Sequence, residues 1–480
     1  MSGKPKNPPR PAMWGKVRKI HFVGIGGAGM SGIAEVLLNL GYEVSGSDLK
    51  SSEVTKRLAK LGGRIYTGHK REQVGDAEVV VTSSAVREDN PEVLEARKRK
   101  ILTIPRAEML AELMRLKHSI AVAGSHGKTT TPSMIATILH QAGLDPTAVI
   151  GGKLDSFGSG ARLGEGELMV VEADESDGSF LKLRPVIAVV TNIDREHLDH
   201  YGSFDKLRES FLNFLNEVPF YGLDVICLDC QVVRGMVGEI QRRYVSYGNS
   251  GDAEIRAVEI RAEEKGCGFD VIRQGKKLGR IVLGVPGRHN AANALAALAV
   301  AFELGVDFAT AADSLNGFKG VHRRFQVKGM AQGITVVDDY GHHPSEIKAT
   351  LEAAREWRPG KGGRIPRRVV VAFQPHRFTR TKLLAGEFAQ AFDQAELLFV
   401  TEIYSAGEDP IAGVSGKALS EQLAEHRKQL GLKTRFVSEL EEIAEEVVKS
   451  LQAGDLFITV GAGNIWQVGE AVLRRLRKKR

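Results

Sequence analysis

Short apolar runs recur along the sequence, and each is followed by glycine or polar residues and then by apolar residues at helical spacing. Continuous apolar runs are typical of strands buried on both faces of a parallel sheet, with helices as the connections. The pattern therefore predicts an α/β fold with doubly wound sheets. The predicted strands lie within 17–26 and at 42–46, 77–82, 119–123, 168–171, 186–190, 224–228, 334–337, 368–373, 397–401 and 456–460. The predicted helices are 33–40, 133–142, 287–305, 344–357 and 382–392, and residues 253–283 are predicted to form short irregular strands.

The chain has 480 residues, which is more than one hydrophobic core usually organises. We therefore predict three domains, separated before the apolar run at 119–123 and after the arginine pair Arg323-Arg324. The predicted domains cover 1–116, 117–326 and 327–480, and the segment 1–15 is predicted to be a disordered tail.

Charge and composition narrow the class of protein. The net charge is +7, but six basic residues lie within 1–19 and six within 471–480, so the body of the chain is slightly acidic. Nucleic-acid binding is therefore not expected, because it needs cationic charge on the folded body. No long apolar run or signal segment is present, so we predict a cytoplasmic protein without membrane insertion.

The sequence AVAGSHGKTTT, at 121–131, follows an apolar strand and precedes the predicted helix 133–142. A glycine turn before a helix directs backbone amides and the helix N-terminus at a phosphate. Lys128 would reach the outer phosphates and Thr129 would hold Mg²⁺, although the turn is two residues shorter than the general phosphate-loop pattern. We predict a nucleoside triphosphate site here rather than an ordinary strand-to-helix turn. Its candidate residues are Gly124, Ser125, His126, Gly127, Lys128, Thr129 and Thr130.

A second glycine block, GIGGAGMSG at 24–32, has G-x-G-x-x-G spacing between a predicted strand and a predicted helix. Asp48 follows the next strand, 19 residues after Gly29, where a carboxylate can bind a ribose hydroxyl. The same amides would bind NAD or another diphosphate such as a nucleotide sugar, so both ligands stay open. The candidates at this site are Gly24, Gly26, Gly27, Gly29, Met30, Asp48, Ser83 and Ser84.

Acidic and imidazole side chains follow two strands of the central region. Glu172 follows strand 168–171, and His197 lies in the segment DREHLDHY after strand 186–190. The carboxyl ends of neighbouring parallel strands lie at one edge of a sheet, so Glu172 and His197 could both face Lys128. A carboxylate and an imidazole can complete a Mg²⁺ shell with waters and phosphate oxygens. We predict Thr129, Glu172 and His197 as metal ligands.

Three loops at strand ends of the C-terminal region concentrate histidine, arginine and aspartate. They are DDYGHH at 338–343, QPHR at 374–377 together with Arg380, and YSAGEDP at 404–410. Three such loops exceed what ordinary turn chemistry gives, so they predict a second site at the edge of a doubly wound sheet.

Taken together, these blocks resemble the Mur ligases of peptidoglycan synthesis over about residues 20–466. The resemblance rests on GIGGAGMSGIAE, AVAGSHGKTTT, EADESD, TNIDREHLDHY, GRHNAANALAA, GVHRRF, DDYGHHPSEI, FQPHRFTRT and YSAGEDPI in this order. It implies a Rossmann-like N-terminal domain for a UDP-substrate, a central P-loop ATPase α/β domain, and a C-terminal Rossmann-like α/β domain that admits an amino acid.

The resemblance also implies the reaction and its partners. The expected reaction is ATP-dependent, Mg²⁺-requiring ligation of L-alanine to the lactyl carboxylate of UDP-N-acetylmuramate through an acyl phosphate. The product would serve cell wall biogenesis, cell shape and cell division, and the enzyme would be a monomer or homodimer.

By the same resemblance, individual residues receive roles. His289, Asn293 and Arg324 are assigned to ATP, and Asp339 to its ribose. His342, Arg377 and Arg380 are assigned to the acyl phosphate and to the carboxylate of the incoming alanine, and Tyr340 would shape a small amino-acid pocket. The expected catalytic residues are Lys128, His197, His342, Arg377 and Arg380.

Two departures from the family pattern stand out. Phe211 occupies the position where many Mur ligases carry a carbamoylated lysine, so Glu172 would supply the missing charge. Ser125 replaces the usual threonine of the phosphate loop and keeps the hydroxyl.

Three alternatives stay open at this point. A related ligase that attaches a recycled tripeptide to UDP-N-acetylmuramate would share the ATP residues. An NAD-dependent dehydrogenase would use the first glycine block but leaves the second phosphate loop unexplained. A non-enzymatic ATP-binding switch has no use for Arg377 and Arg380.

Overall fold

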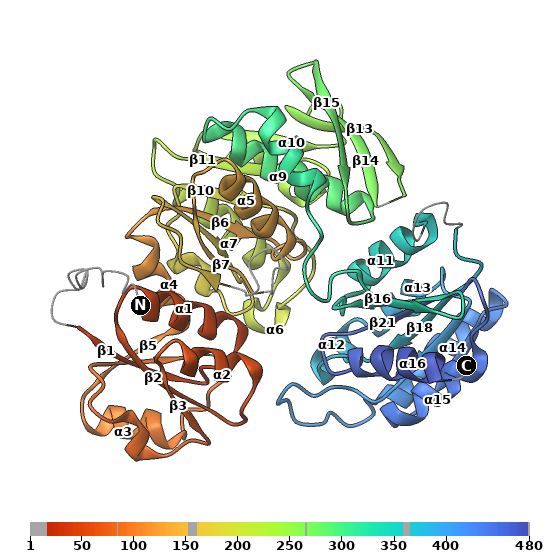
Figure 1. Cartoon of the computed structure of the whole chain (residues 1–480), viewed down its shortest axis with the longest axis horizontal. Helices are drawn as coiled ribbons and strands as arrows, with labels where there is room; N and C mark the ends of the chain where they lie inside the picture. Colours follow the sequence, from red (N-terminus) through yellow and green to blue (C-terminus); the bar gives the residue numbers. More distant parts are fainter. Residues whose placement is uncertain (1–16, 84, 152–160, 265, 359–364, 479–480) are drawn as a thin grey trace, which may run out of the picture. The chain divides into compact units, whose positions relative to one another are not determined.

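The computed structural model describes residues 17–83, 85–151, 161–264, 266–358 and 365–478. The predicted disordered tail and Ser84 lie outside these ranges. The chain divides into two compact units, the first formed by residues up to 256 with 293–314, the second by 257–292 with 315–480. Three sheets with helices between their strands form a mixed α/β fold, as the apolar pattern predicts (Figure 1). Within the described ranges, every helix is too short or too polar to cross a bilayer.

The N-terminal sheet is parallel and has the order β3-β2-β1-β4-β5. Its strand order reverses between β1 and β4, which makes the carboxyl ends of these two strands the expected ligand site. The strands are β1 (Lys19–Val23), β2 (Glu43–Asp48), β3 (Arg64–Thr67), β4 (Val79–Thr82) and β5 (Leu102–Pro105). The helices are α1 (Ala28–Asn39), α2 (Glu53–Lys60), η1 (Arg71–Val74), α3 (Pro91–Lys98) and α4 (Arg106–Met114).

The central sheet in the first unit has the order β12-β11-β10-β6-β9-β7-β8, and it is parallel except for the β7–β8 pair. Of its middle strands, β10 is completely apolar and β6 is nearly so, as burial on both faces of the sheet requires. The strands are β6 (His118–Ala123), β7 (Thr147–Val149), β8 (Ala161–Arg162), β9 (Leu168–Glu172), β10 (Ile187–Val190), β11 (Leu223–Cys227) and β12 (Tyr244–Gly248). The helices are α5 (Thr130–Gln141), η2 (Ser179–Lys182), α6 (Leu198–Tyr201), α7 (Phe204–Asn216), α8 (Gln231–Met236), η3 (Val237–Glu239), α9 (Arg288–Glu303) and α10 (Phe308–Asn316).

Residues 253–283 form strands, as predicted, but these strands are longer than the short ones expected. They form β13 (Ile255–Ala262) and an antiparallel hairpin of β14 (Cys267–Arg273) and β15 (Lys276–Leu283), whose register shifts between Val271 and Ile272. The hairpin turns at Gln274 and Gly275, both with positive φ, which suits the twist of the strands. The length of these strands is difficult to predict from the sequence, because glycines and charged residues interrupt the alternation of apolar and polar residues.

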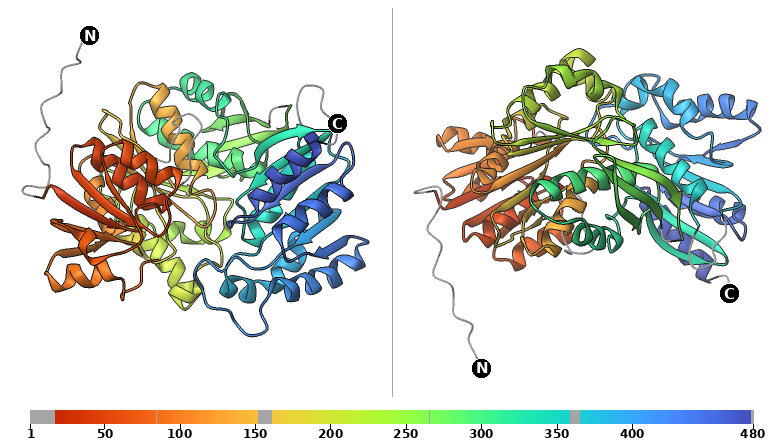
Figure 2. Two further views of the ribbon diagram at one scale, coloured as in Figure 1. Left: turned by 60° about the horizontal axis from the view of Figure 1, so that its bottom comes forward. Right: turned by 90° about the horizontal axis from the view of Figure 1, so that it is seen from above.

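The C-terminal sheet has the order β16-β17-β21-β18-β19-β20, with only β16 antiparallel to its neighbour. Along β18, Val369, Val371 and Phe373 join one apolar cluster and Val370 and Ala372 join another, so both faces are covered. Figure 1 and Figure 2 show α15 and α16 together over one face. The strands are β16 (Gln326–Ala331), β17 (Ile334–Asp339), β18 (Val369–Phe373), β19 (Leu397–Val400), β20 (Lys433–Phe436) and β21 (Leu456–Val460). The helices are α11 (Pro344–Glu356), α12 (Phe378–Leu383), α13 (Ala385–Ala391), α14 (Gly416–Gln429), α15 (Leu440–Ser450) and α16 (Trp466–Lys478).

The helix boundaries differ from the predicted ones near the sites. Helices α1 and α5 start inside the two glycine blocks, several residues before the predicted starts at 33 and 133. Their N-termini therefore lie within the motifs, where a helix N-terminus attracts anions. The single helix predicted at 382–392 is instead divided into α12 and α13 at Leu384.

Candidate active site

The phosphate loop, residues 124–129, connects β6 with α5 through two glycines with positive φ angles, 133° at Gly124 and 83° at Gly127. A Cβ atom on Gly124 would lie 2.1 Å from Thr191 Oγ1, and one on Gly127 would lie 2.6 Å from Asn293 Oδ1. Both the backbone conformation and the lack of space therefore require glycine. The tight turn that the sequence predicts is present.

A second loop, which follows β10, holds the phosphate loop from the side. The backbone amides of Ser125 and His126 donate to the backbone and side-chain oxygens of Asn192, at 3.0 and 2.8 Å. The Thr191 hydroxyl donates to the carbonyl of His126 at 2.6 Å, and His126 Nε2 lies 3.0 Å from Asp194 Oδ2. These two amides are bound inside the protein, which differs from the expectation that the amides of the whole turn face phosphate. The amides at the start of α5 remain the expected phosphate donors, because a first helical turn has no intrahelical acceptors for them.

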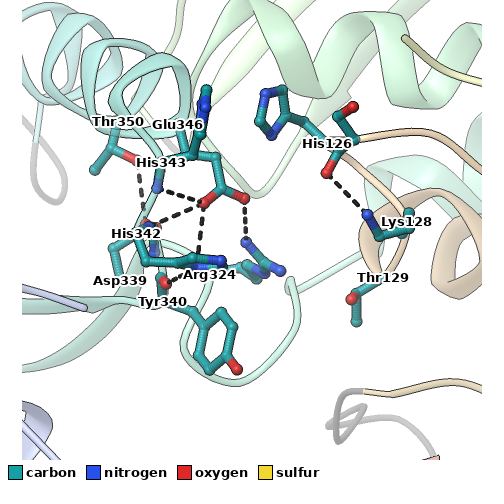
Figure 3. A network of polar contacts seen from close by, with 12 residues as sticks. His126, Lys128, Thr129, Arg324, Asp339, Tyr340, His342, His343, Glu346 and Thr350 are labelled. Atoms are coloured by element: carbon teal, nitrogen blue, oxygen red, sulfur yellow. Dashed lines mark hydrogen bonds and ion pairs between the residues drawn. The ribbon is translucent and has the colours of Figure 1, made fainter. Parts of the chain in front are cut away.

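Lys128 is held by two oxygen atoms of the same unit. Its Nζ donates to Glu175 Oε1 at 2.6 Å and to the carbonyl of Ser125 at 3.0 Å. Burial lowers the pKa of Lys128, but the carboxylates of Glu175, Glu196 and Asp174 outweigh burial and raise the net pKa above its ordinary value. Lys128 is therefore a fixed positive charge beside the loop (Figure 3).

Thr129 lies beside the carboxylate that the sequence predicts as its partner in metal binding. Its hydroxyl is 3.3 and 3.2 Å from the two carboxylate oxygens of Glu172. Glu172 Oε2 also accepts the backbone amide of Gly151 at 2.8 Å. The hydroxyl and carboxylate are both oxygen ligands, which is the chemistry that Mg²⁺ prefers.

His197 lies in a second group of possible cation ligands. One ligand atom from each of Glu175, Glu196 and His197 falls within 4.8 Å of the others, and His197 Nε2 is 3.7 Å from Glu175 Oε1. Glu175 is 1% exposed, and its Oε2 atom is buried without a hydrogen-bond partner among the described residues. The predicted ligands thus fall into two neighbouring sets, Thr129 with Glu172 and His197 with the two additional glutamates. The orphaned oxygen and the donor types fit a divalent cation.

Asn293, one of the residues assigned to ATP, contacts the phosphate-loop helix. Its side-chain oxygen accepts the Thr131 hydroxyl at 3.1 Å. His289 lies on the same helix α9, where its ring packs against Gly287. Phe211, at the family's carbamoyl-lysine position, is fully buried, and its ring centre lies 5.2 Å from that of Phe180 with the two ring planes tilted. Phe211 therefore belongs to the hydrophobic core.

The first glycine block forms the predicted turn between β1 and α1. Gly24 has a φ of 80°, and the Gly26 amide donates to Asp48 Oδ2 at 2.8 Å. Asp48, expected at a ribose, thus has a structural partner in the loop itself. A Cβ atom on Gly29 would lie 2.9 Å from the guanidinium of Arg106. Ser83 Oγ would lie 3.8 Å from a Cβ atom on Gly24, so the serine faces the same turn.

In the second unit, Asp339 ends β17 and is enclosed by protein donors. Its carboxylate accepts the amides of Phe325 and Gly341 at 2.7 and 2.8 Å and the Thr350 hydroxyl at 3.2 Å. Burial raises the pKa of Asp339, although Arg324 opposes this change. The structure thus gives Asp339 a role in fixing the loop, and the predicted ribose contact stays a prediction.

Tyr340 lies close to two arginines of the GVHRRF block. The guanidinium carbons of Arg323 and Arg324 lie 5.0 and 5.1 Å from the centre of its ring, which are cation–π distances. Arg324 Nη1 is 3.3 Å from Glu346 Oε1, while Arg323 donates to Asp338. Figure 3 shows Arg324, Tyr340 and Glu346 converging beside α11.

The predicted amino-acid residues gather around a histidine that the sequence analysis did not select. His376 stacks on Tyr404 at 5.7 Å, and its ring lies 5.6 Å from that of His342. Burial, together with the nearby His342 and Arg380, lowers the pKa of His376 to about 3. A neutral His376 can therefore accept the N–H of Arg380 through Nδ1, at 3.2 Å. Arg377 is the N-cap residue of α12 and has a φ of 70°.

Sequence reasoning missed several residues of these sites although they lie inside the motif blocks. Glu175 follows Glu172 in EADESD, and His376 precedes Arg377 in QPHR. Glu346 completes a capping box at the start of α11, a pattern that is readable from the sequence. Asn192 and Arg323 also lie inside motif blocks, TNIDREHLDHY and GVHRRF, whereas Arg106 has no sequence signal beyond polarity at a helix start.

The fold and sites define a three-domain α/β protein with a phosphate loop, and comparison with known families agrees. Three family models match: "Mur ligase family, catalytic domain" at residues 19–118, "Mur ligase middle domain" at 122–301, and "Mur ligase, glutamate ligase domain" at 323–463. Together they cover most of the chain, which therefore belongs to the Mur ligase family.

Individual relatives are similar over nearly their full lengths. The UDP-N-acetylmuramate–L-alanine ligase of Geobacter sulfurreducens is 55% identical over 469 residues, covering 98% of this chain and 100% of the relative. The protein of the same name from an Anaeromyxobacter species is 56% identical and covers 95% and 97%.

Among solved structures, the UDP-N-acetylmuramate-alanine ligase MurC of Thermotoga maritima has a TM-score of 0.81 at 32% identity, covering 96% of this chain and all of that one. A murein peptide ligase from Psychrobacter arcticus, at 24% identity and a TM-score of 0.69 over 96% and 98% of the chains, shares the fold.

Proposed function

We propose that this protein joins L-alanine to the lactyl carboxylate of UDP-N-acetylmuramate with hydrolysis of ATP to ADP and phosphate. The observation that carries the proposal is the phosphate loop with Lys128 fixed beside Thr129 and Glu172, because it provides for phosphoryl transfer. The choice of substrates is supported by the names of relatives that match nearly the whole chain.

The reaction would proceed in two steps because a carboxylate is a poor electrophile. A carboxylate oxygen of the lactyl group attacks the γ-phosphorus of ATP, the bond to the β-phosphate oxygen breaks, and ADP leaves. The alanine amine then attacks the carbonyl carbon of the acyl phosphate, loses a proton, and expels phosphate through a tetrahedral intermediate. Both steps concentrate negative charge, so electrostatic stabilisation is the expected main contribution.

The central domain provides the groups for the first step. Lys128 and the N-terminus of α5 would stabilise the outer phosphates. Thr129 and Glu172 would hold Mg²⁺, with His197 as a further ligand, and Mg²⁺ when bound would neutralise phosphate charge. Asn293 would position the loop and nucleotide through its contact with Thr131.

The C-terminal domain provides the groups for the amine. Arg377 and Arg380 would bind the alanine carboxylate, and the neutral His376 orients Arg380 through its Nδ1 acceptor. Tyr340, whose ring contacts two arginines, would limit the pocket to a small side chain. His342 would lie at the reacting carbonyl.

The N-terminal domain would bind the UDP-substrate through the first glycine block, with its diphosphate at the N-terminus of α1. We place the domains at 1–116, 117–326 and 327–480 and expect a cytoplasmic enzyme of peptidoglycan precursor synthesis. The three family matches favour this ligand over NAD, since a ligase has no hydride to transfer.

Phosphate release from ATP tests the substrate assignment. Wild-type protein with UDP-N-acetylmuramate and Mg²⁺ is assayed against L-alanine, other free amino acids and the tripeptide of the recycling ligase. Release that depends on L-alanine supports the proposal. Preference for the tripeptide would establish the recycling ligase instead, and release that needs no amine would support a switch or a simple ATPase.

A further inference from the structure

Glu175, which also belongs to the possible cation-ligand group of His197, makes a contact with Lys128 to which the proposed function gives no role. Its Oε1 accepts the Lys128 ammonium at 2.6 Å, and its Oε2 is buried without a hydrogen-bond partner among the described residues. The Tyr201 hydroxyl donates to the backbone carbonyl of Glu175 at 2.6 Å, which fixes the residue from the other side. The carboxylate is therefore rigidly placed on the lysine, at a point where only 1% of the residue is exposed.

We propose that Glu175 is a positioning residue that competes with the outer phosphates of ATP for Lys128. In the nucleotide-free protein it holds the ammonium in the loop, and bound ATP draws the lysine onto its phosphates. The inference rests on the proposed function, because it assumes that Lys128 binds ATP.

The competition follows from charge and geometry. A buried ammonium needs an anion, since an unpaired charge in the interior is costly, and Glu175 is the carboxylate in direct contact with it. A triphosphate that approaches Lys128 meets this carboxylate as a rival acceptor and as a repelling charge. Removing the charge of Glu175 should therefore strengthen ATP binding. The same change should impair catalysis, because a neutral acceptor at position 175 holds the ammonium less firmly than the carboxylate does.

Glu172 has a different environment, although it lies only three residues away on the same segment. Its oxygens face the Thr129 hydroxyl and the Gly151 amide. The two glutamates of the EADESD block thus contact different residues of the phosphate loop. Glu172 contacts Thr129, and Glu175 contacts Lys128. This division predicts that Glu175→Gln strengthens the binding of ATP without Mg²⁺. Glu172→Gln should instead weaken the binding of ATP with Mg²⁺.

Calorimetry in the presence of a chelator tests the competition without catalysis. Glu175→Gln should bind ATP about tenfold more tightly than wild type, the factor expected from the loss of one charge-assisted rival contact. AMP affinity should be unchanged, because AMP lacks the outer phosphates. Asp177→Asn, which removes a charge from the same loop while keeping the acceptor for the Ser179 amide, is the control and should leave ATP affinity unchanged.

Steady-state kinetics provide a second readout. Glu175→Gln should lower both KM for ATP and kcat, a split that general loosening of the fold would not produce. Unchanged or weaker ATP binding by a folded Glu175→Gln variant overturns the inference. If the wild type itself binds no ATP, the proposed function fails, and that outcome is distinct from equal binding by wild type and variant.

A double-mutant comparison keeps the inference testable even where the single variant folds poorly. Lys128→Met leaves the Glu175 carboxylate buried without its counter-ion, so its melting temperature should fall clearly below that of wild type. Adding Glu175→Gln should restore part of this loss. A double variant that is no more stable than Lys128→Met would contradict a direct pairing.

Discussion

The Thr131 hydroxyl donates to the side-chain oxygen of Asn293 at 3.1 Å and thereby connects the phosphate-loop helix α5 with α9. The same asparagine oxygen would lie 2.6 Å from a Cβ atom on Gly127. Asn293 therefore rests directly on the backbone of the phosphate loop, and the contact determines where that backbone lies.

Thr131→Val removes this hydrogen bond while keeping the volume of the side chain. The valine removes the hydroxyl donor that connects Asn293 with the phosphate-loop helix, so we expect KM for ATP to rise by about tenfold. KM for UDP-N-acetylmuramate should change little in the same steady-state assay. Thr137→Val is the matched control, because the Thr137 hydroxyl donates to a carbonyl of its own helix. Equal effects of both variants would show that Thr131 has only a helical role.

Glu172→Gln tests the predicted metal ligand. The glutamine keeps an acceptor for the Thr129 hydroxyl and the Gly151 amide but loses the charge that attracts Mg²⁺. Half-saturation should need about tenfold more Mg²⁺, both in activity and in calorimetry with a non-hydrolysable ATP analogue. The control is Glu167→Gln, at an exposed residue just before β9, whereas Glu172 ends this strand. Its Mg²⁺ titration should match that of wild type. A normal Mg²⁺ titration of Glu172→Gln would remove this residue from the metal site.

Gly26→Val tests the first glycine block. A Cβ atom on Gly26 would lie 2.8 Å from Asp48 Oδ2, the atom that accepts the Gly26 amide, so valine disrupts the turn at the N-terminus of α1. KM for UDP-N-acetylmuramate should rise far more than KM for ATP, and NAD should neither bind nor compete. Gly235→Ala, where an added Cβ atom meets no atom within 4 Å, serves as the control. Protection of the wild type by NAD against thermal unfolding would reverse the assignment.

Asp224→Asn concerns stability. Both carboxylate oxygens of Asp224 in β11 are buried and have no hydrogen-bond partner among the described residues. Burial raises the pKa of Asp224 to about 8, although Arg242 opposes this rise. Between the ordinary carboxyl pKa of about 4 and this value, the folded chain holds a proton that the unfolded chain releases.

The free energy of unfolding contributed by Asp224 must therefore fall as the pH rises through this range. Asn at position 224 does not titrate, so the variant should match wild type at about pH 4 and become more stable by a few kcal/mol at about pH 8. Urea unfolding of both proteins across this pH range provides the measurement. A difference in the free energy of unfolding between variant and wild type that stays constant with pH would mean that Asp224 does not keep its proton in the folded chain.

The sequence predicts the strands and the two glycine turns well because they depend on local properties. Continuous apolar runs give β6 and β10, and glycines with positive φ angles at positions 124 and 127 give the loop. The starts of α1 and α5 were predicted too late, because the polar motif residues hide the first helical turn. The hairpin of β14 and β15 was missed because its stability comes from pairing between strands rather than from its own pattern.

The composition of the sites was less predictable than their positions. Lys128, Thr129 and Glu172 could be selected because their residue types and spacing match phosphate and metal chemistry. The pairing of Lys128 with Glu175, and of His376 with Arg380, depends on side-chain directions across the sheet edge. Asp48 was selected by spacing and Asp339 by the family resemblance, each for a ribose, and each accepts a backbone amide from another segment of the protein.

Transfer of a labelled oxygen tests the central claim most directly. UDP-N-acetylmuramate carrying heavy oxygen in its lactyl carboxylate is incubated with the protein, ATP, Mg²⁺ and L-alanine, and the products are weighed by mass spectrometry. Because the acyl phosphate retains a carboxylate oxygen on phosphorus, the account predicts one heavy oxygen in each released phosphate and an alanine adduct of the UDP-sugar. Phosphate without heavy oxygen, or release of phosphate without the alanine adduct, would contradict it.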